Sequence, residues 1–101
     1  MRVLMKASFP VEAGNKGIKD GSLPKTIMDF VQKNKPEAAY FVSENGLRTS
    51  YFFFDLKDVS DIPSVVEPFF MNLNALVEVT PAMNVEDMRT GTAKAVRASE
   101  K

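Results

Sequence analysis

Three residues that could carry out acid–base chemistry lie in one aromatic-rich stretch of the chain: Tyr40, Tyr51 and Asp55. Because tyrosine ordinarily titrates at about pH 10, an unaided tyrosine donates a hydrogen bond rather than accepting a proton. Asp55 could act as a base only if burial raised its pKa; otherwise its expected role is to help end a strand. The sequence does not identify catalytic residues, and Tyr51 and Asp55 are the candidates.

The chain contains no histidine and no cysteine. Without histidine there is no usual proton shuttle near neutral pH, and a Ser-His-Asp triad, a Cys-His pair and a histidine-bound metal are excluded. Without cysteine there are no disulfides, no thiolate nucleophile and no cysteine-bound zinc. We therefore predict no metal site and no cofactor.

Equal numbers of acidic and basic residues, 13 of each, give a formal net charge of zero. A nucleic-acid-binding protein usually carries a basic excess, so we predict no nucleic-acid partner. No apolar run approaches the roughly 18 residues that a membrane-spanning helix needs, and the N-terminal apolar run is too short for a signal-peptide core. We expect a cytoplasmic protein without a membrane partner.

The chain is organised around a predicted β-hairpin at residues 38–56. Its centre is Asn45-Gly46, a pair that tolerates the positive φ angles of a tight type I′ turn. The second arm holds four consecutive aromatic residues, Tyr51 to Phe54. Because side chains alternate along a strand, two of these aromatics point to each face of the sheet. Both faces of this strand therefore need apolar cover.

The remaining elements follow from apolar spacing. Alternation predicts strands at residues 2–9 and 74–80, and each is ended by a proline. Helical spacing predicts three helices. The first and third begin after the capping candidates Ser22 and Asn84, and the second has a choice of caps among Asp58, Ser60 and Asp61. Residues 11–19 could form a short helix, but glycines weaken it. The spacing of these glycines fits no phosphate-binding motif, so we expect a flexible connection or lid there.

This order of elements predicts an α+β fold, the ferredoxin-like βαββαβ plait. Its four-stranded antiparallel sheet has the strand order 4-1-3-2, with both main helices on one face and an extra C-terminal helix. We expect residues 1–101 to form a single domain whose tail frays beyond about residue 96.

Three segments resemble small, uncharacterised bacterial proteins of the dimeric α/β-barrel superfamily. They are Val3-Leu4-Met5-Lys6-Ala7-Ser8-Phe9-Pro10, Asp20-Gly21-Ser22-Leu23-Pro24 and the helix–strand unit from Ser60 to Pro81. The resemblance covers nearly the whole chain as architecture and includes no catalytic signature. It implies a homodimer with paired sheets. Some members are cofactor-free monooxygenases or isomerases; the haem-binding members use a histidine that this chain lacks.

The sheet face away from the helices has the composition of an interface. Alternation places an apolar centre there, with charged residues around it, and an interface typically has this pattern. Arg2 or Lys6 is expected to pair with Glu78 across neighbouring strands. We predict a homodimer through the residues Leu4, Tyr51, Phe53, Leu76 and Glu78.

A small-molecule site is predicted between sheet and helices. Pro68 interrupts the second helix, and two interpretations remain: the aromatic residues around it fill the core, or a kink opens an aromatic pocket. In the second case the ligand-binding residues would be Tyr40, Phe52, Phe54, Phe69 and Phe70.

Function is left open between classes. The preferred hypothesis is a homodimer that binds a small, largely apolar molecule; the alternatives are a monooxygenase- or isomerase-like enzyme without a cofactor and a purely structural dimer. Whether the protein is an enzyme is not decided. Arg48, Tyr51 and Phe53 also resemble the base-stacking strand of RNA-recognition modules, but the glycines of that motif are missing.

Overall fold

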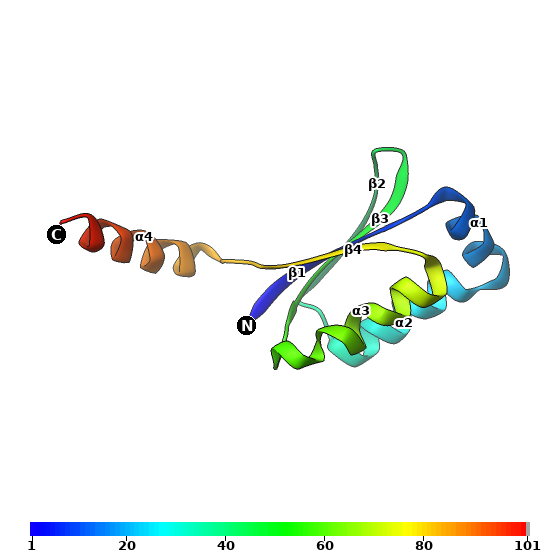
Figure 1. The fold of residues 1–101 in the computed structure, drawn as a ribbon, viewed down its shortest axis with the longest axis horizontal. Coiled ribbons are helices and arrows are strands. Elements are labelled where there is room, and N and C mark those ends of the chain that lie inside the picture. Colours follow the sequence, from blue (N-terminus) through cyan, green and yellow to red (C-terminus); the bar gives the residue numbers. More distant parts are fainter. Residues whose placement is uncertain (101) are drawn as a thin grey trace.

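The computed structural model describes residues 1–100 and contains one four-stranded antiparallel sheet with the order β2-β3-β1-β4 (Figure 1). This is the predicted order read from the other edge, so the ferredoxin-like plait is confirmed. The elements are β1 (Arg2–Phe9), α1 (Val11–Asp20), α2 (Ser22–Asn34), β2 (Ala38–Glu44), β3 (Leu47–Asp55), a 3-10 turn η1 (Val59–Asp61), α3 (Ile62–Leu73), β4 (Leu76–Pro81) and α4 (Val85–Ser99).

The main helices α2 and α3 lie side by side against one face of the sheet (Figure 1). Alternate residues of the central strand β1 point toward them and are fully buried. The largest core side chains are aromatic and come from both layers: Phe9, Phe30, Phe52, Phe54 and Phe69. Burial of this apolar surface is the main force that holds the helices on the sheet.

The turn between β2 and β3 has the predicted backbone conformation. Asn45 and Gly46 have φ angles of 54° and 75°, which a tight type I′ hairpin turn requires. The register that follows places Tyr40 opposite Tyr51. The hairpin prediction is confirmed.

We expect replacement of Asn45-Gly46 by Val-Val to destabilise the protein by about 1–3 kcal/mol at each position, because β-branched residues are strained at positive φ. Urea unfolding followed by circular dichroism measures this loss. The control is Asn45→Gly, which keeps a residue that tolerates positive φ. Equal stability of the Val-Val variant and the unchanged protein would contradict the role given to the turn.

Residues 11–20 form the helix α1, so the short helix considered for residues 11–19 is present and the flexible connection preferred there is wrong. Two of its glycines allow close contact with neighbouring elements. A Cβ at Gly17 would lie 2.8 Å from Leu23 Cβ and 3.0 Å from Leu73 Cδ2, and a Cβ at Gly14 would lie 2.5 Å from Arg48 Nη1. Close packing of this helix therefore outweighs the low helix propensity of glycine.

Two element boundaries differ from the sequence predictions. Strand β4 begins at Leu76 instead of residue 74, because Asn74 adopts a φ of 50° that ends α3. The side chain of Ser22 does not cap α2; instead its backbone N–H donates a hydrogen bond of 2.8 Å to Asp20 Oδ1.

Helix α3 continues through Pro68. Phe69 and Leu73, which follow the proline, are 0% and 1% exposed, so this end of the helix stays packed in the core. The hollow beside Pro68, between α2 and α3, has a volume of only about 150 Å³. Phe69 therefore fills the core, Phe70 is exposed, and the end of the helix is not lifted off the sheet to open a pocket.

Helix α4 projects away from the rest of the molecule (Figure 1). With α4 included, the molecule measures 58 × 28 × 19 Å along its principal axes. The predicted capping box is present, with Asn84 and Asp87 bonded reciprocally. An ion pair of 3.0 Å between Arg2 Nη1 and Asp87 Oδ2 joins its first turn to β1. All its residues are exposed, and it is helical to Ser99; Lys101, the last residue of the predicted frayed tail, lies outside the described residues.

Candidate functional site

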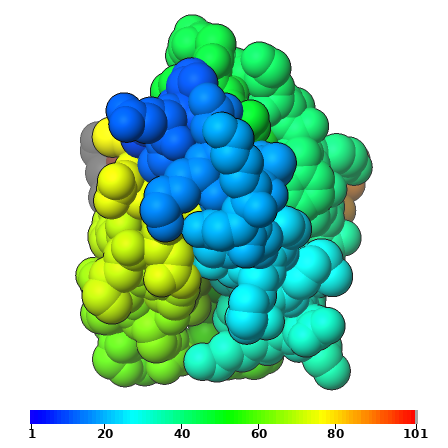
Figure 2. Space-filling model, turned by 90° about the vertical axis from the view of Figure 1, so that its right-hand side faces the viewer, coloured from blue at the N-terminus to red at the C-terminus, as the bar shows by residue number. Residues whose placement is uncertain are grey.

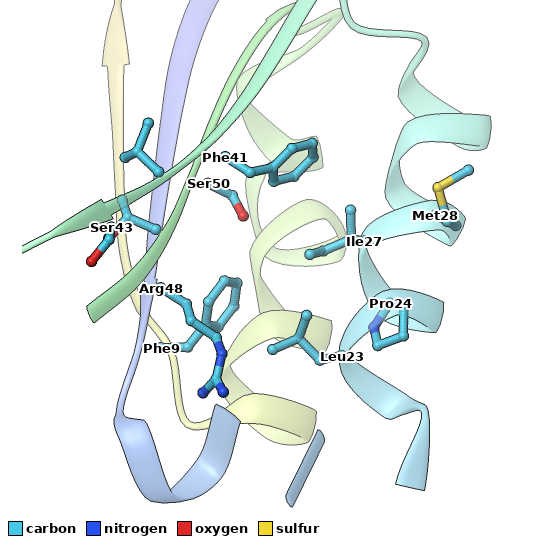
Figure 3. Close-up of a pocket in the computed structure, with 11 residues that line it drawn as sticks. Phe9, Leu23, Pro24, Ile27, Met28, Phe41, Ser43, Arg48 and Ser50 are labelled. Atoms are coloured by element: carbon cyan, nitrogen blue, oxygen red, sulfur yellow. The ribbon is translucent and has the colours of Figure 1, made fainter. Parts of the chain in front are cut away.

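A cavity of about 540 Å³ lies between α2 and the end of the β2–β3 hairpin that carries the turn (Figure 3). Its walls are mostly apolar and include Phe9, Leu23, Ile27, Met28 and Phe41. Drug-sized ligands typically occupy pockets of about 300–1,000 Å³. The cavity is therefore large enough for a small molecule.

The cavity follows from the order of side chains along β3. The face of β3 toward the helices carries Arg48, Ser50, Phe52 and Phe54 in sequence. The two phenylalanines fill one half of the space between sheet and helices. Ser50 is much smaller, so the other half of that space stays open to the cavity (Figure 3).

Phe41 forms the wall of the cavity on the β2 side. Its ring reaches from the strand toward α2 (Figure 3) and packs edge-on against Phe52, with ring centroids 5.9 Å apart. Phe41 is nevertheless 57% exposed, and Met28 on the opposite wall is 50% exposed. Apolar surface on both sides of the cavity thus remains in contact with solvent.

Polar groups enter the cavity from β3. The hydroxyl of Ser50 points into the space (Figure 3), although the residue is only 1% exposed, and none of the described residues makes a hydrogen bond to it. Arg48 lies at the end nearest α1, where its Nη2 donates a hydrogen bond of 3.1 Å to Asn15 Oδ1. Within residues 1–100, Arg48 has no carboxylate partner.

Helix α1 and the start of α2 cover this end of the molecule, with the hairpin on one side and the α3–β4 connection on the other (Figure 2). Arg48 therefore lies where three elements meet, namely β3, α1 and α2 (Figure 3). Its guanidinium donates a hydrogen bond to the side chain of Asn15 and lies close to Gly14, which has no side chain to obstruct it.

None of the five predicted ligand-binding residues lines this cavity. Phe52, Phe54 and Phe69 are fully buried and pack around Phe30, with ring centroids 4.5 to 5.8 Å from it. The structure thus brings these three together as filled core.

Tyr40 lies on the opposite face of the sheet and is 63% exposed, and Phe70 is exposed on α3. The sequence prediction missed the cavity because it placed the ligand among large aromatic residues, whereas the cavity results from the small side chain of Ser50. The available signal was a serine at a core-facing position of an aromatic strand.

Asp55 does not have the raised pKa that base catalysis needs. Hydrogen bonds from Lys57 Nζ (2.6 Å) and from the amino group of Met1 (2.7 Å) lower its pKa to about 2. The pKa of Tyr51 is raised, first by the hydrogen bond that its hydroxyl donates to Glu44. Neither side chain reaches the cavity.

Tyr51 belongs to a polar cluster on the open face, together with Lys6 and Glu44. Lys6 forms an ion pair with Glu44, and its Nζ lies 5.8 Å from the centroid of the Tyr51 ring. The hydrogen bond from Lys6 is also the first cause that lowers the pKa of Glu44. The predicted pairing of Lys6 with Glu78 is wrong, although the two residues are opposite in register.

The predicted alternative pairing, from Arg2 to Glu78, is also wrong. Arg2 Nε bonds Glu37 at 2.8 Å, and its Nη1 bonds Asp87. These partners lie before β2 and at the start of α4, so the ion pairs of the open face join segments that are distant in the sequence. Arg48 points to the helix side, away from Tyr51 and Phe53, so the three residues do not form one stacking surface.

The five predicted interface residues share the open face of the sheet. Register places Leu4 beside Phe53, Lys6 between Tyr51 and Glu78, and Ser8 beside Leu76. Leu4, Tyr51 and Phe53 are half-buried, whereas Leu76 is 63% exposed. The centre of this face is thus apolar, and its interface role remains a prediction.

Within residues 1–100, no group of three or more acidic, histidine or cysteine side chains is arranged to hold a metal ion. The described helices include none with the length and hydropathy to cross a membrane. The candidate functional site is the cavity between α2 and the hairpin, which combines a mostly apolar wall with the polar side chains of Arg48 and Ser50.

No protein-family model and no curated protein matches the sequence. Among solved structures, the chain is similar to a formyltetrahydrofolate deformylase from Pseudomonas putida KT2440, with a TM-score of 0.52 and 10% identity. The match covers 81% of this chain and 29% of that one, so the chain spans less than a third of its length. At this identity the likeness shows the fold alone, and membership in the dimeric α/β-barrel superfamily stays a prediction.

Proposed function

We propose that this protein is a homodimer in which each protomer binds a small, largely apolar molecule between the sheet and α2. The observation that carries the proposal is the apolar cavity of about 540 Å³. This hollow is open to solvent, and its walls are mostly apolar side chains from the sheet and from α2. Small-molecule sites are typically concave, mostly apolar hollows of this size with a few polar groups.

The walls of the cavity explain why an apolar molecule would bind. Phe41 and Met28 remain half-exposed, and Leu23 and Ile27 lie between them on α2. A ligand that removes these side chains from water gains roughly 25 cal/mol for each Å² of apolar surface buried. Because the walls include no carboxylate or tyrosine, we propose binding and not acid–base catalysis.

The homodimer is supported by two apolar surfaces that the protomer leaves uncovered. One is the open face of the sheet, where Leu76 is 63% exposed. The other is the apolar side of α4, where Val85, Met88 and Val96 recur at helical spacing and are 61%, 48% and 54% exposed. Apolar side chains grouped on a surface in this way are typical of sites that bind another protein.

Charge favours a second copy of this chain as the partner. On the open face, Glu78 forms no ion pair with another described residue, and the same holds for Lys94 and Arg97 on α4. In a dimer with a two-fold axis, Glu78 of each copy could pair with Lys94 or Arg97 of the other copy. The symmetry would form this contact twice, as a self-complementary interface requires.

We expect the neutral dye N-phenyl-1-naphthylamine to bind saturably, with one site per chain and enhanced fluorescence. Ser50→Phe should weaken this binding about tenfold or more, since the added ring points into the cavity and fills space that the dye needs. The control is Ser64→Phe on the exposed side of α3. Absence of saturable binding, or equal binding by both variants, would overturn the proposed function.

A further inference from the structure

We propose that the ligand of this cavity is an amphipathic acid, an apolar molecule that carries one carboxylate, and that Arg48 binds this carboxylate. The inference rests on the proposed function and assigns its substrate class. The apolar body would lie between Phe41 and α2. The carboxylate would lie at the end of the cavity next to α1.

The first support is the charge of Arg48. This arginine forms no ion pair within residues 1–100, whereas Arg2 and Arg89 are paired with carboxylates. Arg97 is also unpaired among the described residues, but it lies on the exposed helix α4 and does not line the cavity. Its Nη2 bonds only the neutral oxygen of Asn15, so the guanidinium keeps its positive charge and further donors. A planar guanidinium binds a carboxylate through two parallel hydrogen bonds, which makes it suited to this ligand group.

The second support is the position of Arg48 on the cavity wall. Arg48 and Ser50 are two residues apart on β3, so both point to the helix side of the sheet. The remaining wall is mostly apolar, and a cation at one end of such a wall selects a ligand with one charged end. The free hydroxyl of Ser50 provides a second donor farther inside the cavity (Figure 3).

The third support is Gly14, which leaves room for the guanidinium. A Cβ at this position would lie 2.5 Å from Arg48 Nη1, so any other residue would displace the end of this flexible side chain. Glycine is costly inside a helix, by roughly 0.5–1 kcal/mol relative to alanine. Gly14 thus acts as a positioning residue for Arg48.

Competition against N-phenyl-1-naphthylamine tests the inference. We expect decanoate, below its micelle concentration, to displace the dye at a concentration about tenfold or more lower than 1-decanol, which has the same chain without the charge. In Arg48→Met the ratio between acid and alcohol should fall to about one, and Arg48→Lys should restore part of it. The ratio cancels changes in apolar contacts, because both competitors share them.

Gly14→Ala provides a second test that keeps the arginine. The variant should be at least as stable as the unchanged protein, since alanine favours helix, yet its preference for decanoate should fall severalfold. Gly91→Ala is the matched control, because a Cβ there meets no atom within 4 Å and the preference should stay intact.

The outcomes separate the two proposals. If the dye binds and decanoate and 1-decanol displace it equally, the amphipathic-acid inference is overturned and the apolar site stands. The inference is also overturned if Arg48→Met keeps the preference for the acid. If the dye does not bind saturably to the unchanged protein, the proposed function itself fails.

Discussion

Phe53→Glu is expected to convert the proposed homodimer into a monomer. Phe53 is half-buried at the centre of the open face, beside Leu4 on β1 and Ala38 on β2. A stable two-fold interface here should bury at least about 1,200 Å² in total. The variant would place one unpaired carboxylate from each protomer at its centre, and desolvation of such a charge is strongly unfavourable. We expect the dimer dissociation constant to rise by about 100-fold or more.

Sedimentation equilibrium at micromolar concentration measures this change, since a protomer has a mass of 11.2 kDa and the dimer twice that. The matched control is Phe70→Glu, the same substitution at an exposed aromatic of α3 on the other side of the molecule. Phe53→Glu should still bind N-phenyl-1-naphthylamine, because the cavity lies on the helix side of the sheet. A single 11.2 kDa species for the unchanged protein would contradict the dimer.

Phe69→Ala is expected to destabilise the protein by about 3–5 kcal/mol. The Phe69 side chain is 0% exposed, and its ring lies 5.8 Å from that of Phe30, 6.1 Å from that of Phe52 and 6.4 Å from that of Phe9. Truncation removes a large apolar group and leaves a cavity where β1, β3, α2 and α3 meet. Because small domains have a total stability of about 5–15 kcal/mol, this loss is a large part of the whole.

Urea unfolding at a fixed protein concentration measures the loss, because dimerisation would make stability concentration-dependent. Phe70→Ala is the matched control: the neighbouring phenylalanine of the same helix is 39% exposed, and its truncation should cost far less. Similar effects of the two substitutions would mean that Phe69 does not join the helices to the sheet.

The two surfaces of the sheet thus have separate expected roles. On the helix side, Phe52 and Phe54 are used for packing, and Ser50 leaves space for a ligand. On the open side, Tyr51 and Phe53 are half-buried and belong to the surface that we propose for a partner chain. Alternation along one aromatic strand supplies both surfaces, so dimerisation and ligand binding are expected to respond to different substitutions of the same strand.

The amino-acid sequence by itself determined the backbone pattern of the protein. Asn45-Gly46 required positive φ, the alternation in β1 and β3 identified which residues face the helices, and Asn84 with Asp87 marked the start of α4. The order of strands followed from these elements and from the handedness of their connections. Such features depend on residues close together in the chain, and local spacing reports them directly.

Only the tertiary structure decided where a cavity stays open and which side chains lie close to the glycines of α1. Gly14 and Gly17 belong to a helix because Arg48, Leu23 and Leu73 come close to them, and no local pattern contains that distance. The cavity exists because small Ser50 lies across from α2, and its volume depends on side chains from several elements. Local spacing specifies the face on which a side chain lies, whereas the gap between two faces depends on the side-chain volumes that both layers bring to it.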